Sequence, residues 1–155
     1  MAFPWSLIVK AGLLAGSLDI ISAFLYGYIK SKGSTTPDVI LGYISKTAFG
    51  KNTFTSPVML SITGLLTHFA IAFSWTIIFF FLYSRVKMMR INSILTAFIY
   101  GIFMWLMMTM VILPLWTGKT YVFKAENAII SSLILVIAIG IPISLIAQNY
   151  YSKKN

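Results

Sequence analysis

The sequence contains no cysteine among its 155 residues. Disulfide bonds, zinc–thiolate sites, iron–sulfur clusters and thiol chemistry from this chain are therefore excluded. Acidic residues are also scarce: three Asp and Glu residues accompany 12 Lys and Arg residues. The charged fraction is 10%, whereas a soluble domain usually carries about 25%. This composition predicts a protein that is surrounded by lipid rather than by water.

Common enzyme signatures are missing as well: a nucleophile elbow, a phosphate-binding glycine loop and the HExxH motif. With one histidine and three acidic residues, a catalytic set would depend almost wholly on Asp19 and His68. We therefore predict a protein that is not an enzyme and that holds no metal and no cofactor. A haem on His68 would need a second axial ligand from a methionine or from another chain.

The net charge of +9 does not indicate nucleic-acid binding, because the basic residues fall mostly between apolar runs and at the C-terminal end. Apolar residues make up 59% of the chain, and the mean hydropathy is +0.90. Four segments, at residues 5–29, 57–86, 93–116 and 126–149, are long enough to cross a bilayer. These observations predict one all-α integral membrane domain over residues 1–155, an antiparallel bundle of four transmembrane helices with the lipid bilayer as partner.

The longest connection, between the first two segments, has helix signals of its own. Thr36 precedes Pro37, Asp38 falls in the first turn, and Gly50 follows the end. Apolar residues recur there at helical spacing, which predicts a short amphipathic helix at about 37–49, on the membrane surface or over the mouth of the bundle. Pro114 and Pro142 lie where they can bend the third and fourth segments.

Orientation follows from the basic residues. With both termini on one side, six basic residues fall on each side of the membrane. Arg85, Lys87 and Arg90 are packed beside helix ends, whereas the opposite side spreads its lysines over longer loops, so we expect both termini in the cytoplasm.

Asp19 lies inside the first apolar segment, where an ionisable group rarely faces lipid. It belongs to a stripe of small residues at helical spacing: Gly12, Gly16, Ala23 and Gly27. The second segment has a similar stripe, with His68 among Ser61, Gly64, Ala72 and Trp75. Asp19 and His68 each lie about 15 Å from the same membrane face, counted at the helical rise. We therefore predict that they meet.

Other polar residues lie near this pair. Trp105 and Thr109 of the third segment are expected to border it, and Glu126 and Ser131 of the fourth to line the mouth above it. Together these residues predict a polar track to mid-membrane, closed below by apolar side chains. The aromatic residues 79–81 and Tyr83 are expected to contact lipid and its interface.

Three interpretations of the Asp19–His68 pair stay open at the level of sequence. It can be a structural pin between two helices. It can handle protons or ions, because a histidine beside a carboxylate titrates near neutral pH. It can also contact a ligand, lipid or cofactor, or the two residues can fail to meet.

Four stretches, AGLLAGSLDIISAF, YISKTAFG, GLLTHFAIAFSW and AFIYGIFMWLMMTMVILPL, resemble small four-helix bacterial inner-membrane proteins of uncharacterised families, remotely including the YagU-like proteins. The resemblance implies a bacterial inner-membrane location and a four-helix fold, and it carries over no site residues.

We therefore expect a multi-pass inner-membrane protein whose polar centre handles protons, ions or a small solute, as in a channel or transporter. The alternative is a non-catalytic accessory or scaffold subunit of a larger membrane complex. A weaker alternative is an intramembrane enzyme or a lipid-binding protein. A four-span chain encloses few layers of side chains, so we expect a homo-oligomer or a larger complex.

Overall fold

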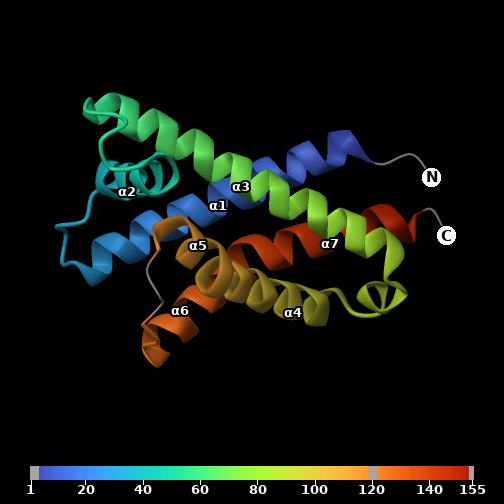
Figure 1. Ribbon diagram of the computed structural model, residues 1–155. Helices are drawn as coiled ribbons and strands as arrows, with labels where there is room; N and C mark the ends of the chain where they lie inside the picture. Colours follow the sequence, from blue (N-terminus) through green and yellow to red (C-terminus); the bar gives the residue numbers. More distant parts are fainter. Residues whose placement is uncertain (1–3, 119–121, 154–155) are drawn as a thin grey trace.

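The computed structural model describes residues 4–118 and 122–153. Lys119 and Lys154, which were counted among the six basic residues on each side of the membrane, lie outside the described residues. The described elements are all helical, and the chain begins and ends at the same end of the molecule (Figure 1). Four helical stretches are long and apolar enough to cross a membrane: Trp5–Lys30, Pro57–Arg85, Ser93–Thr117 and Ala125–Ser152.

The first two of these stretches are the single helices α1 (Trp5–Lys30) and α3 (Pro57–Arg85), with α2 (Pro37–Phe49) between them. The third consists of α4 (Ser93–Leu106), the π-helical segment η2 (Met107–Ile112) and α5 (Leu113–Thr117). The fourth consists of α6 (Ala125–Leu135), the π-helical segment η3 (Val136–Gly140) and α7 (Ile141–Ser152). A short 3-10 helix, η1 (Lys87–Arg90), joins α3 to α4.

The helix ends follow from local chemistry. The Asn92 side chain accepts hydrogen bonds from the backbone N–H groups of Ile94 and Leu95, each at 3.0 Å, and so caps α4. Pro37 and Pro57 occupy the first turns of α2 and α3, where the missing N–H would have no helical partner. Gly118 ends α5 in the left-handed region, at φ 65°.

Both π-helical segments precede a proline. A helical proline cannot donate to the carbonyl four residues earlier, and its ring crowds that carbonyl. For Pro114 this carbonyl belongs to Met110 in η2, and for Pro142 it belongs to Ala138 in η3. The helices therefore accommodate the prolines by widening the preceding turn, which the sequence could indicate only as a bend.

Helix α3 packs against the small-residue stripe of α1. A Cβ atom at Gly12 would lie 2.6 Å from the Phe73 ring, and one at Gly16 would lie 3.0 Å from the Phe69 ring. Glycine at these two positions therefore lets the aromatic side chains of α3 lie directly on the backbone of α1.

The short helix α2 packs on α3 across a second close approach. A Cβ atom at Gly64 would overlap the backbone carbonyl of Leu41, so only glycine admits α2 at this position. Beside this contact the hydroxyl groups of Ser45 and Thr63 lie 2.7 Å apart in a hydrogen bond, and Ser45 is fully buried. Gly64 thus faces α2, whereas Gly12 and Gly16 form the seat between α1 and α3.

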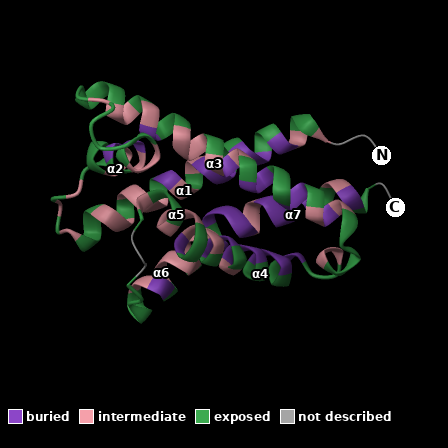
Figure 2. Ribbon diagram, in the orientation of Figure 1, coloured by how far each residue is buried: buried purple, intermediate pink, exposed green. Residues whose placement is uncertain are grey.

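The main cluster of buried side chains draws on α1, α3, α4 and α7, and Figure 2 shows buried positions along these helices. Phe79, Phe80 and Tyr83 are each at most 1% exposed, and the Tyr100 ring lies 4.8 Å from the Phe79 ring. The expectation that residues 79–81 and Tyr83 contact lipid is therefore wrong for all but Phe81, which is 50% exposed. Aromatic rings bury more area than other side chains, and a four-helix core of this size uses them to fill its centre.

Candidate functional site

Asp19 and His68 line one cavity of about 210 Å³. Asp19 comes from α1 and His68 from α3, and every other long stretch adds a wall. Two further lining residues, Tyr43 and Thr47 of α2, carry hydroxyl groups. The others are apolar: Ile44, Ile71, Ala72, Trp75, Met104, Met108, Leu113, Trp116, Leu135 and Ile139. The cavity is therefore an apolar chamber with one carboxylate and one imidazole.

The imidazole of His68 is held by the backbone of α1. Its Nε2 atom lies 2.9 Å from the carbonyl oxygen of Gly16, in a hydrogen bond. A carbonyl can only accept, so Nε2 carries the proton and donates it. In neutral His68 the second ring nitrogen, Nδ1, is consequently the basic atom, and it can take up a further proton.

The Asp19 carboxylate makes no hydrogen bond with His68 in the part of the chain that the structure describes. Both side chains are half-buried, and they lie close enough for a protonated His68 to attract the carboxylate. The helices are joined by the bond from His68 to the Gly16 carbonyl, one turn before Asp19. The structure thus places the pair in one chamber without a direct bond between them.

Trp75 closes the cavity on the side of the aromatic core. The side chain is 7% exposed and belongs to both the cavity wall and the core. The buried hydroxyl of Tyr100 donates to the Trp75 backbone carbonyl at 2.6 Å and links α4 to α3 there. Beyond Trp75 the rings of Phe79 and Tyr83 lie buried in the aromatic core.

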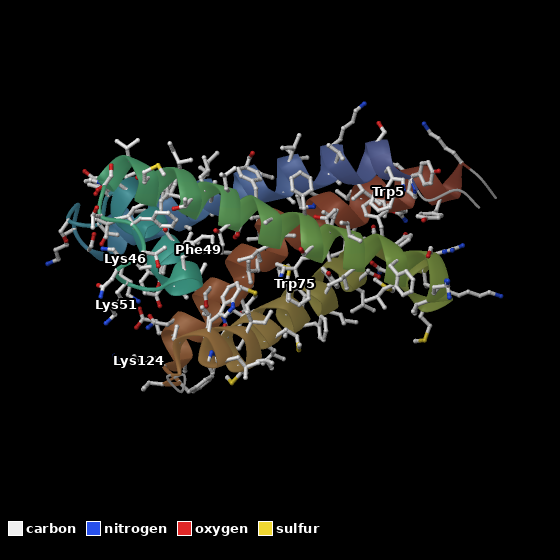
Figure 3. All side chains as sticks on the ribbon, turned by 45° about the horizontal axis from the view of Figure 1, so that its top comes forward. Trp5, Lys46, Phe49, Lys51, Trp75 and Lys124 are labelled. Atoms are coloured by element: carbon white, nitrogen blue, oxygen red, sulfur yellow. The ribbon has the colours of Figure 1, made fainter. Side chains whose placement is uncertain are left out.

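A larger cleft of about 800 Å³ adjoins the cavity, between α2 and α5. Four residues line both spaces: Tyr43, Thr47, Leu113 and Trp116. Thr109, which was expected beside Asp19 and His68, lines this cleft instead. Figure 3 shows the cleft lysines Lys46 and Lys51 at the same end of the molecule as Lys124, with Trp75 deeper in the bundle.

Two other predicted site residues, Trp105 and Ser131, form a separate contact between α4 and α6. The Trp105 indole N–H donates to the Ser131 hydroxyl at 2.7 Å, and that hydroxyl donates to the Asn127 carbonyl at 2.5 Å. Neither residue lines the chamber of Asp19 and His68. Glu126 is exposed in the first turn of α6.

One polar cluster was not anticipated from the sequence. The Lys30 ammonium at the end of α1 donates to the Asn127 side-chain carbonyl on α6 and, at 3.0 Å, to the Tyr26 hydroxyl. The pairing joins residues 97 positions apart, so no local pattern could show it. The only sequence signal was that Tyr26 and Lys30 lie four residues apart on one helix face.

Among residues 4–118 and 122–153, no group of three His, Asp or Glu side chains is arranged to hold a metal ion. Comparison of the chain with protein-family models, curated proteins and solved structures found no match. The four long apolar helices fit a membrane protein.

Proposed function

We propose that this chain is a channel- or transporter-like protein of the bacterial inner membrane, in which Asp19 and His68 bind and pass on protons, small ions or a small polar solute. In this proposal the four long helices cross the membrane as an antiparallel bundle with both termini in the cytoplasm. The chain works as a homo-oligomer or within a larger membrane complex.

The observation that carries the proposal is the shared chamber. A carboxylate inside a membrane costs several kcal/mol by insertion scales, and such groups usually serve a pathway or a bound ligand. Asp19 lies in a cavity of about 210 Å³, which has room for several water molecules or one small solute. A residue that served only to pin two helices would be expected to bond its partner directly, and Asp19 does not bond His68 in the described residues.

His68 supplies the second half of the chemistry. Because Nε2 donates to the Gly16 carbonyl, Nδ1 is the atom that gains and loses a proton. Protonation there places a cation beside the Asp19 carboxylate, and deprotonation leaves the carboxylate free for a cationic solute. The chamber can therefore exchange a proton for a bound cation without any large movement of its walls.

Nothing on the described surface favours the alternative of an accessory subunit. Stripes of small residues are typical contact faces between membrane helices, but Gly12 and Gly16 contact Phe73 and Phe69 of the same chain. Gly64 likewise contacts α2. The stripes are used within the molecule, so they give no support to a docked partner.

Proton flux into proteoliposomes tests the proposal. A potassium gradient with valinomycin sets the membrane potential, and a trapped pH-sensitive dye reports proton entry. We expect the wild-type chain to raise proton entry above that of empty vesicles. Asp19→Asn and His68→Ala should each lower this flux by at least about a hundredfold, the lower end of the scale for a lost proton-transfer group.

Asp38→Asn is the matched control, because Asp38 is an exposed carboxylate in the first turn of α2. This variant undergoes the same chemical change outside the chamber and should keep wild-type flux. The proposal is wrong if the wild-type chain moves no protons above background, or if folded Asp19→Asn protein keeps the full rate.

A further inference from the structure

The cleft between α2 and α5 carries positive charge without a balancing acid. Lys46 and Lys51 line it, whereas none of the three acidic residues of the chain does. Both lysines are exposed, and neither ammonium group forms an ion pair or hydrogen bond within the described part of the chain. The cleft therefore presents two free ammonium groups to whatever occupies it.

The depth of the cleft in the membrane follows from the third long apolar stretch, which forms one of its walls. The third long apolar stretch ends at Thr117, and both Thr117 and Trp116 line the cleft. Trp116 is 47% exposed, and Tyr43 on the opposite wall is 61% exposed. An exposed tryptophan at the end of a spanning helix, with an exposed tyrosine on the opposite wall, is typical of the level of the lipid headgroups.

The remaining walls are suited to hydrocarbon. Leu113, Pro114 and Val122 line the cleft, and Leu113 and Trp116 continue into the apolar inner chamber. A volume of about 800 Å³ is within the range of pockets that hold a small-molecule ligand, about 300–1,000 Å³. The cleft thus offers cations at one level and an apolar surface beside them.

We propose that this cleft binds one anionic phospholipid. The headgroup phosphate lies between the ammonium groups of Lys46 and Lys51, and part of an acyl chain lies along Leu113 and Trp116. This site does not depend on the proposed proton pathway, since it needs neither Asp19 nor His68.

Native mass spectrometry of the full chain in detergent tests the site. The protein is titrated with phosphatidylglycerol and, separately, with phosphatidylcholine that has the same acyl chains. We expect one phosphatidylglycerol to bind more tightly than the zwitterionic lipid. A lysine near a membrane surface contributes about fivefold in affinity for anionic lipid, so Lys46→Gln/Lys51→Gln should weaken binding about thirtyfold.

Lys87→Gln/Lys153→Gln is the matched control, because both lysines are exposed and lie outside the cleft. It removes the same charge and should keep wild-type binding of phosphatidylglycerol. Equal loss in both double variants, or equal binding of the two lipids, would overturn the proposal. Displacement of the lipid by millimolar inorganic phosphate would also overturn it, by showing that the site recognises a free phosphate.

Discussion

At the scale of the residue, Asp19 and His68 differ in how they are held. His68 has a hydrogen-bond partner in the Gly16 carbonyl, at 2.9 Å, whereas Asp19 has no hydrogen bond in the described part of the chain. A half-buried carboxylate that accepts no hydrogen bond opposes folding, because its charge loses part of its water and gains no hydrogen bond in return. Asp19 therefore lowers the stability of the fold that contains it.

This difference gives a prediction for stability. Asp19→Asn should leave the free energy of unfolding in detergent unchanged or raise it by about 1–2 kcal/mol, because it removes the desolvated charge at nearly constant volume. His68→Ala should lower it by about 0.5–1.5 kcal/mol through the lost hydrogen bond. Denaturant unfolding followed by tryptophan fluorescence measures both.

A marked loss of stability in Asp19→Asn would contradict this account and support the interpretation of the pair as a structural pin. The same variant serves in the flux experiment, so the two measurements separate a functional carboxylate from a structural one.

The sequence placed Asp19 and His68 in a common region because helical rise converts residue number into depth. It could not give the atoms that meet, since these depend on side-chain rotamers and on how α1 and α3 are turned about their axes. Trp105 illustrates the limit: its depth was suitable for the pair, but its indole turns to Ser131 on α6. Depth is encoded locally, whereas orientation is set by the packed neighbours.

At the scale of the element, the position of α2 depends on Gly64 of α3 and not on Gly42 of α2 itself. Gly64 of α3 lies against the Leu41 carbonyl of α2, whereas a Cβ atom at Gly42 would meet nothing within 4 Å. In this position α2 supplies one wall of the chamber and one wall of the cleft that Lys46 and Lys51 line.

We expect Gly64→Ala to cost about 1–3 kcal/mol, the range for an overpacked contact, because the backbone of α2 must move. Gly42→Ala should be neutral or should stabilise α2 by about 0.5–1 kcal/mol, since alanine favours a helix more than glycine does. The free energy of unfolding measures the difference, and limited proteolysis at residues 50–56 reports release of α2. Equal behaviour of the two alanine variants would show that α2 is not seated through Gly64.

The helical segments themselves were largely predictable. Long, largely apolar runs indicated the four long stretches, and the structure gives the last as Ala125–Ser152 where 126–149 was expected. Pro37 and Gly50 bounded α2 correctly. The π-helical turns were not predictable in kind, because a proline can be accommodated by a kink or by a widened turn.

At the scale of the whole molecule, tight packing and open space are separated along its length. The aromatic core lies toward the end that carries the termini, and α2 and the cleft lysines lie at the other end (Figures 1 and 3). A chamber that opens toward one end and is closed by packed rings toward the other suits a site loaded from one side of a membrane. In the proposed orientation that side is the periplasm.

Thiol labelling tests this orientation, and the absence of native cysteine gives each variant a single reactive thiol. Asn52→Cys lies in the exposed loop after α2, and Met88→Cys lies in η1, where Met88 is 78% exposed. In intact bacteria a membrane-impermeant maleimide should label Asn52→Cys and leave Met88→Cys unlabelled until the cells are permeabilised. The physical reason is the cluster of Arg85, Lys87 and Arg90, which favours the cytoplasmic side. The reverse pattern would invert the orientation and place the cleft lysines in the cytoplasm. Labelling of both sites in intact cells would contradict the single crossing, by α3, that separates residue 52 from residue 88.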